Sequence, residues 1–202
     1  MLAVVAGCAA APATVPTAGC ADVDVVFARG TGQPPGFGRV GDPFVAAIAA
    51  GLPGLTVGSH AVDYAADAQQ QFSPGATDLV RHVEDVAAVC PGTRFVLGGY
   101  SQGALVVSLA IGVPMAEASS PALDPTLSPR VVAVVAFGNP LGSQGRSLET
   151  TATPFRLQSR EFCNAGDGVC ARRGPRMGSH RSYPDDGATS EAAAFVVARL
   201  GP

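Results

Sequence analysis

One seven-residue stretch constrains the fold of this chain more than any other, Leu97-Gly98-Gly99-Tyr100-Ser101-Gln102-Gly103. It follows the short apolar run 94–97 and leads into the apolar run 104–110, which predicts a strand that turns sharply into a helix. The glycines two residues to either side of Ser101 have no Cβ, so the backbone can turn tightly while Ser101 takes a strained conformation. In this context the Gly-x-Ser-x-Gly pattern predicts the nucleophile of a serine hydrolase rather than a glycine-rich turn with an incidental serine.

Composition limits the classes of protein that fit. A chain of 202 residues with 47% hydrophobic and 14% charged residues is long enough for one domain with a substantial core. Its formal charge of −3 and the lack of a basic cluster give nucleic-acid binding no electrostatic support. After the N-terminal region, no stretch reaches the roughly 18 apolar residues that span a bilayer. We expect a monomer without nucleic-acid partners or spanning segments.

The N-terminal residues 1–13 are small and apolar, like the hydrophobic part of a secretory signal, although the first positive side chain is Arg29. We therefore predict a signal-like or flexible segment over 1–19 and a single domain over 20–202. The run Val5-Ala6-Gly7-Cys8 also resembles a bacterial lipobox, which would make Cys8 a lipid anchor. The protein is expected to be secreted, extracellular or associated with the cell wall.

Five cysteines leave one unpaired if the others form disulfides. Cys8 is the natural odd one, because it lies in the segment expected to be removed or lipidated. The remaining four cysteines allow three pairings, and the sequence alone does not choose among them; the close spacing of Cys163 and Cys170 makes these two the more obvious local bridge. Oxidised cysteines are typical of exported proteins.

Apolar runs that alternate with helical patterns predict a mostly parallel sheet covered by helices on both faces. The resulting fold class is α/β, a three-layer α/β/α sandwich around five strands. The strands are expected over 23–28, 55–64, 94–97, 130–137 and 154–158. The helices are expected over 42–50, from 73 to about 89, after Ser101 to before Pro114, and over 189–200, with a long loop before the last helix.

A serine hydroxyl needs a base within hydrogen-bond reach and a carboxylate that fixes the base's tautomer. In α/β-hydrolases these partners follow the serine in the order acid, then histidine. Of the three histidines only His180 follows Ser101; His60 is interpreted as an end-of-strand residue and His82 as a solvated or capping residue on a helix.

The acid must lie between Ser101 and His180, where the chain has five candidates. These are Glu117, Asp124, Glu149, Glu161 and Asp167. Asp167 is preferred because Cys163 and Cys170 would close a glycine-rich loop around it and hold its carboxylate still. Asp beside glycine is also common in ordinary turns, and Glu161 is the alternative acid.

The oxyanion of the tetrahedral intermediate needs preorganised N–H donors. One is expected to be the backbone N–H of Gln102, directly after the nucleophile, and a second should come from the loop Gly30-Thr31-Gly32 after the first strand. Thr31 can add its hydroxyl, or it can be a loop residue that only hydrogen-bonds its neighbours.

Two other functions compete with hydrolysis. Gly36-Phe37-Gly38-Arg39-Val40-Gly41 fits the dinucleotide-binding pattern Gly-x-Gly-x-x-Gly, and Asp63 follows at a suitable distance. However, the glycines do not begin at the end of the first strand, as that site requires. A secreted, non-catalytic lipid-binding or antigenic protein on the same fold would be marked by loss of a triad residue, and all three are present.

Together, four motifs resemble the cutinase family of small serine esterases. They are Phe27-Ala28-Arg29-Gly30-Thr31, Gly99-Tyr100-Ser101-Gln102-Gly103, the cysteine-bracketed Asp167, and Gly178-Ser179-His180. The resemblance implies a single-domain, lid-free α/β-hydrolase that is exported and needs no cofactor. It implies a triad of Ser101, Asp167 and His180, an oxyanion hole of Thr31 and Gln102, and disulfides Cys20–Cys90 and Cys163–Cys170. It leaves open whether the esters hydrolysed are short-to-medium acyl esters, lipids or polyesters such as cutin.

Overall fold

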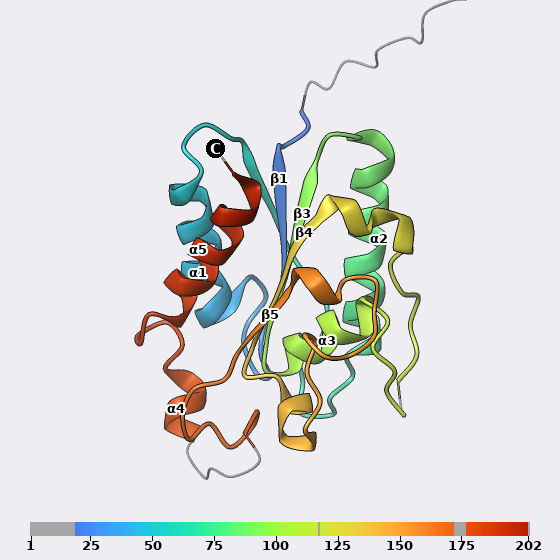
Figure 1. Ribbon diagram of the computed structural model, residues 1–202. Helices are drawn as coiled ribbons and strands as arrows, with labels where there is room; N and C mark the ends of the chain where they lie inside the picture. Colours follow the sequence, from blue (N-terminus) through green and yellow to red (C-terminus); the bar gives the residue numbers. More distant parts are fainter. Residues whose placement is uncertain (1–18, 117, 172–176, 202) are drawn as a thin grey trace, which may run out of the picture.

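Five parallel strands form the centre of the molecule (Figure 1). The structure, a computed structural model, describes residues 19–116, 118–171 and 177–201. The strands pair in the order β2-β1-β3-β4-β5. They are β1 (Val23–Ala28), β2 (Val57–Ala61), β3 (Arg94–Tyr100), β4 (Val131–Phe137) and β5 (Ser159–Phe162). Because parallel strands end at the same edge of a sheet, the loops that follow them meet there, where α/β proteins bind their ligands.

Helices cover both faces of the sheet, as a parallel sheet with two apolar faces requires. The helices are α1 (Gly38–Gly51), α2 (Ser73–Val89), α3 (Gln102–Ala110), α4 (Met177–Arg181) and α5 (Ala188–Leu200). Figure 1 shows α1 and α5 on one face and α2 and α3 on the other. Successive side chains of β1 alternate between two buried clusters, with Val25 and Phe27 in the cluster of α1 and α5, and Val26 in that of α2 and α3. The predicted three-layer α/β/α fold is therefore confirmed.

The prediction of the last strand over 154–158 is wrong. A 3-10 turn occupies Arg156–Gln158, and the strand follows at Ser159–Phe162. Residues two apart in a strand point to the same face of the sheet, but here Phe155 is buried while Leu157 is 73% exposed. The apolar residues at this spacing therefore do not belong to the sheet. Pairing with β4 begins only at Ser159, which lies opposite Val134.

Two helix predictions also need correction. α1 begins at Gly38 rather than near Asp42, because Val40, Phe44 and Ile48 form one fully buried stripe at four-residue spacing. Pro43 consequently lies inside the helix. The long loop expected before the last helix contains the short helix α4, which carries His180. The second strand is shorter than the predicted 55–64.

Both disulfides of the predicted pairing are present. Cys20 and Cys90 join the start of β1 to the end of α2, with their Cα atoms 5.6 Å apart. Cys163 and Cys170 close the loop after β5, with their Cα atoms 5.9 Å apart. The signal-like segment predicted for 1–19 lies outside the described residues except for Gly19, and so does Cys8. In the described part of the chain, no helix has both the length and the apolar character needed to cross a bilayer.

Candidate active site

Ser101 lies at a strained corner between β3 and α3. Its φ of 56° and ψ of −117° place it in a region that residues with a Cβ rarely adopt. The glycines beside it are required by close backbone contacts. A Cβ on Gly99 would lie 2.2 Å from the Gly103 carbonyl oxygen, and one on Gly103 would lie 1.9 Å from that of Ala28. The sequence pattern therefore specifies this turn by sterics, and the turn points the serine out of the sheet.

The structure brings the three predicted residues Ser101, His180 and Asp167 together. The Ser101 Oγ lies 2.9 Å from His180 Nε2, and His180 Nδ1 lies 2.8 Å from Asp167 Oδ2. An ionised carboxylate can only accept hydrogen bonds, so Nδ1 carries the ring proton and Nε2 is free to accept the one from Ser101. His180 is 3% exposed and Asp167 is fully buried. Such a chain of nucleophile, base and acid can activate a hydroxyl for acyl transfer.

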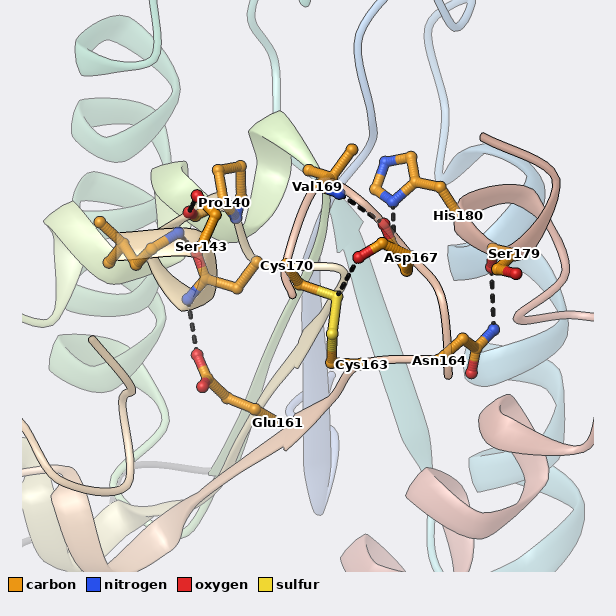
Figure 2. The surroundings of a disulfide bond; sticks show 12 residues. Pro140, Ser143, Glu161, Cys163, Asn164, Asp167, Val169, Cys170, Ser179 and His180 are labelled. Carbon is orange, nitrogen blue, oxygen red and sulfur yellow. Dashed lines mark hydrogen bonds and ion pairs between the residues drawn. A yellow bond between two sulfur atoms is a disulfide. The ribbon is translucent and has the colours of Figure 1, made fainter. Parts of the chain in front are cut away.

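Asp167 is held by more donors than His180 alone. Its Oδ1 accepts the Val169 N–H at 2.8 Å, and its Oδ2 also accepts the Tyr183 hydroxyl at 2.6 Å. Burial by itself raises the pKa of the Asp167 carboxyl, but the hydrogen bonds from Tyr183, His180 and Val169 outweigh it and bring the pKa below its usual value. Figure 2 shows how the Cys163–Cys170 disulfide closes the loop that carries Asp167 beside His180. The carboxylate is thus both ionised and fixed.

His180 is positioned from the ends of β3 and β4. The Tyr100 ring stacks on the imidazole with centroids 4.9 Å apart, and its hydroxyl donates to the His180 carbonyl oxygen at 2.8 Å. At the end of β4, Gly138 has a φ of +57°, and a Cβ there would lie 2.6 Å from His180 Cε1. Only glycine leaves room for the imidazole at this position.

The two predicted oxyanion-hole residues, Thr31 and Gln102, contact each other beside Ser101. The Thr31 hydroxyl donates to Gln102 Oε1 at 3.1 Å, and it accepts from Gln70 Nε2 at 3.3 Å. Gln102 is the first residue of α3, and the N–H groups of a helix's first turn lack acceptors within the helix. The Gln102 N–H, directly after Ser101, is therefore a donor without an acceptor in the first turn of α3.

A cleft of about 560 Å³ opens at Ser101. Thr31, Gln70 and Tyr100 contribute to its wall, and Arg39 and Arg181 are its only permanently charged lining residues in the described part of the chain. No group of three or more His, Cys, Asp and Glu side chains within 19–116, 118–171 and 177–201 is arranged to hold a metal ion. The cleft is large enough for part of an acyl chain beside the serine.

The alternative acid, Glu161, is not brought to His180. Its Oε1 accepts from Asn139 Nδ2 at 2.6 Å, and Figure 2 shows its side chain pointing away from His180. Burial raises the pKa of Glu161. The glycine pattern 36–41 does not form a phosphate-binding loop, because Gly38 to Gly41 already belong to α1.

The other two histidines have partners of their own and do not line the cleft at Ser101. His60 Nε2 contacts Asp78 Oδ2 at 2.8 Å, and His82 Nε2 contacts Asp24 Oδ2 at 2.7 Å. The two rings stack with centroids 3.9 Å apart. The interpretation of His82 as a solvated or capping residue is therefore wrong, because its ring is part of a partly buried cluster between β1, β2 and α2.

Comparison with known protein families decides the classification. The family model described as Cutinase matches residues 19–200. The chain belongs to the cutinase family. The match spans nearly all of the chain and includes the sheet, the turn at Ser101, and the segments that carry Asp167 and His180.

Relatives within the cutinase family support the same classification. A cutinase of Kineococcus radiotolerans is 49% identical over 181 residues, which cover 88% of this chain and 61% of that protein. A probable carboxylesterase of Mycobacterium tuberculosis, Culp3, is 42% identical and matches over 90% of this chain and 70% of its own length. The chain thus spans less than two thirds of the Kineococcus cutinase.

A solved structure agrees with the fold. Trichoderma reesei cutinase in complex with a phosphonate inhibitor is 31% identical, covers 91% of this chain and 78% of its own, and superposes with a TM-score of 0.74. These relatives are ester hydrolases, and ester hydrolysis is the class of reaction to which the cutinase family assignment points.

Sequence reasoning missed the residues that support the triad. Tyr183, Tyr100 and Gln70 all contact a predicted site residue, but nothing in the sequence pattern singles them out. The nearest signal is the spacing of Tyr183, three residues after His180. A tyrosine so close to a predicted base, in a segment with few other aromatic residues, could have been flagged.

Proposed function

We propose that the chain is a secreted serine esterase that hydrolyses carboxylic esters through a Ser101–His180–Asp167 triad and an acyl-enzyme intermediate. The observation that carries the proposal is the pair of contacts at 2.9 Å and 2.8 Å that links the strained Ser101 to His180 and on to Asp167. We include residues 20–202 in one domain, because both apolar clusters pack against the same sheet.

The first half-reaction forms the acyl-enzyme. Ser101 Oγ attacks the ester carbonyl carbon while its proton passes to His180 Nε2, and Asp167 stabilises the resulting imidazolium. The tetrahedral intermediate places its negative charge on the former carbonyl oxygen. Collapse breaks the bond to the alcohol oxygen, which takes the proton from His180 Nε2, so that the alcohol leaves and Ser101 stays acylated.

Water then repeats the sequence in the second half-reaction. His180 Nε2 accepts a proton from water as the water oxygen attacks the acyl carbon, and it returns a proton to Ser101 Oγ as the acid is released. In both halves the oxyanion is stabilised by the Gln102 N–H and by the Thr31 hydroxyl, whose proton turns from Gln102 Oε1 toward the oxyanion when substrate is bound. Each such donor is typically worth about 3 kcal/mol in the transition state.

The substrates proposed are short-to-medium acyl esters, lipids or polyesters such as cutin. The cleft at Ser101 is open to solvent and its wall includes Val169 and Tyr100 as well as polar groups, which suits an acyl chain beside a polar ester. Two disulfides support export to an oxidising compartment, since such bonds rarely persist in the cytosol. The comparisons give no support for a lipid anchor at Cys8, and none is proposed.

The test is hydrolysis of p-nitrophenyl butyrate by the wild-type chain and by Ser101→Ala. The variant should lose several orders of magnitude in kcat, because the members of a triad act as a unit. Thr31→Val, which keeps the shape but removes the hydroxyl, should lower kcat by about 10²-fold with little change in KM. Retention of most activity by Ser101→Ala would refute the proposed mechanism.

A further inference from the structure

Tyr183 is among the most deeply enclosed side chains of the molecule and lies directly behind the triad. It is fully buried, and its ring packs edge-on against Tyr100, Phe137 and His180, with centroids 5.9, 5.8 and 6.3 Å away. Its hydroxyl lies 2.6 Å from Asp167 Oδ2. Packing alone would be satisfied by phenylalanine, so the buried hydroxyl calls for a separate explanation.

The direction of the Tyr183 hydrogen bond is fixed by its surroundings. The Asn164 N–H donates to the phenol oxygen at 3.2 Å, and the Asp167 carboxylate can only accept. The phenol proton therefore points at Asp167 Oδ2. Burial, reinforced by the hydrogen bond to Asp167 and its negative charge, raises the pKa of Tyr183 far above its usual value, so the hydroxyl remains a donor throughout the working pH range.

The Tyr183 hydroxyl and His180 Nδ1 share one oxygen. Both donate to Asp167 Oδ2, at 2.6 and 2.8 Å. The hydrogen bond from the phenol stabilises part of the negative charge on Oδ2, and that part attracts the proton on His180 less strongly. The strength with which Asp167 retains the proton on His180 therefore depends on whether the Tyr183 bond is made.

We propose that Tyr183 is a positioning residue of the triad, which fixes the Asp167 carboxylate through Oδ2 and weakens its hold on the proton of His180. This inference rests on the proposed function of Asp167 and His180. It assigns Tyr183 a part in setting the pH at which the base becomes active, beyond its part in packing.

Other charged and titratable groups face His180 from each neighbouring element. Tyr100 stacks on it from β3, and burial raises the pKa of Tyr100 to about 12, so this phenol is also protonated. The guanidinium groups of Arg39 in α1 and Arg181 in α4 line the same cleft. In the described residues Asp167 is the only carboxylate within hydrogen-bond reach of His180. Because its pKa lies below the usual value, Asp167 also stays ionised in the pH range in which the base works.

The decisive measurement is the pH profile of kcat/KM with p-nitrophenyl butyrate for Tyr183→Phe. Without the phenol proton, Asp167 offers more negative charge to His180, so the protonated, inactive base persists to higher pH. We expect the midpoint of the acidic limb to rise by about 0.5 pH unit, together with a loss of about tenfold at the optimum. A role limited to packing would lower activity and melting temperature without moving the midpoint.

Tyr100→Phe is the matched control. It also removes one hydroxyl from a buried tyrosine beside His180, but that hydroxyl donates to the His180 carbonyl oxygen and does not contact Asp167. We expect its profile to keep the wild-type midpoint even if its kcat is lower. An equal shift in both variants, or no shift in Tyr183→Phe, would overturn the proposal.

A second variant covers the case in which Tyr183→Phe does not fold. Incorporation of 3-fluorotyrosine at position 183 keeps the ring and makes the phenol a stronger donor, so the acidic midpoint should move to lower pH. An unchanged midpoint would overturn the proposal. Failure of the proposed function is recognised separately, since Ser101→Ala would then retain the activity of the wild-type chain.

Discussion

The two disulfides allow stability and activity to be separated, because they lie at opposite ends of the sheet. Cys20–Cys90 joins residues 70 positions apart, at the end of the sheet where β1 starts. Cys163–Cys170 spans 7 residues and closes the loop that carries Asp167, at the end where Ser101 lies. We predict that replacing Cys20 and Cys90 by serine has the larger effect on stability, whereas replacing Cys163 and Cys170 by serine has the larger effect on catalysis.

The size of each effect on stability follows from loop closure in the unfolded chain. A separation of 7 corresponds to about 2.4 kcal/mol, and a separation of 70 to about 4.4 kcal/mol. For a chain of this length, 1 kcal/mol changes the melting temperature by about 2–4 °C. The expected decreases are therefore about 5–10 °C for Cys163→Ser with Cys170→Ser, and about 9–18 °C for Cys20→Ser with Cys90→Ser.

The effect on activity should run the other way. With the 163–170 loop open, Asp167 keeps its bonds to Tyr183 and Val169 but loses the covalent restraint on its backbone. We expect a 10- to 100-fold loss in kcat, below the roughly 10⁴-fold loss that accompanies a missing triad acid. The Cys20–Cys90 variant should keep its kcat at temperatures where it is folded.

Circular dichroism melts and p-nitrophenyl butyrate kinetics on the same samples, at 20 °C, test both rankings. Full activity in the folded Cys163→Ser, Cys170→Ser variant would show that Tyr183 and Val169 hold the carboxylate without the disulfide. Equal losses of kcat in both variants would show that activity only follows global stability. Either result would contradict the reasoning.

Two further predictions concern the half-buried Glu161 and the buried Asp78. Glu161→Gln should leave kcat/KM within about twofold of the wild type and raise the melting temperature at pH 8; because burial raises the pKa of Glu161, the gain should shrink as the pH falls and the wild-type side chain becomes protonated. A large loss of activity would instead favour Glu161 as the acid. For Asp78, burial raises the pKa, but hydrogen bonds from His60, the Asp63 N–H and Arg81 outweigh this effect and bring the pKa below its usual value. Ionised Asp78 therefore contributes its full stability above the unfolded pKa of about 4, and this contribution is lost as the pH falls through the lower folded pKa. Asp78→Asn should have a lower melting temperature at pH 7 and a smaller decrease of melting temperature below pH 4. A constant difference in melting temperature between variant and wild type at all pH values would argue against this.

Local pattern and chain order were enough to predict the fold class and to select three residues, Ser101, Asp167 and His180, that the structure brings together. The turn at Ser101 is specified by two glycines whose replacement would cause backbone clashes, so a short motif contains the whole constraint. The strand at the edge of the sheet was misplaced for the opposite reason. Phe155 and Leu157 alternate like a strand, but whether a segment joins β4 is decided by partners that are distant in sequence.

The support of the triad could not be predicted because it is tertiary. Tyr183 contacts Asp167 across 16 residues and Tyr100 contacts His180 across 80 residues. Neither separation follows any helical or strand period. Gly138 follows the predicted strand 130–137, and the structure shows that its missing side chain makes room for the imidazole. Glycine is thus required at Gly99 and Gly103 by nearby backbone atoms and at Gly138 by a neighbouring side chain.

The three histidines show what distinguishes the pair at the candidate site from the other two histidine–aspartate pairs. His60, His82 and His180 each lie 2.7–2.8 Å from a carboxylate oxygen, so a histidine–aspartate contact does not by itself mark a site. The rings of His60 and His82 stack on each other, and among the described residues no serine hydroxyl contacts the second nitrogen of either ring. His180 instead has its second nitrogen against a serine held at a positive φ beside an open cleft. The nucleophile's backbone strain, more than the carboxylate, is therefore the feature that assigns the chemistry, and it is the one that the sequence encodes most locally.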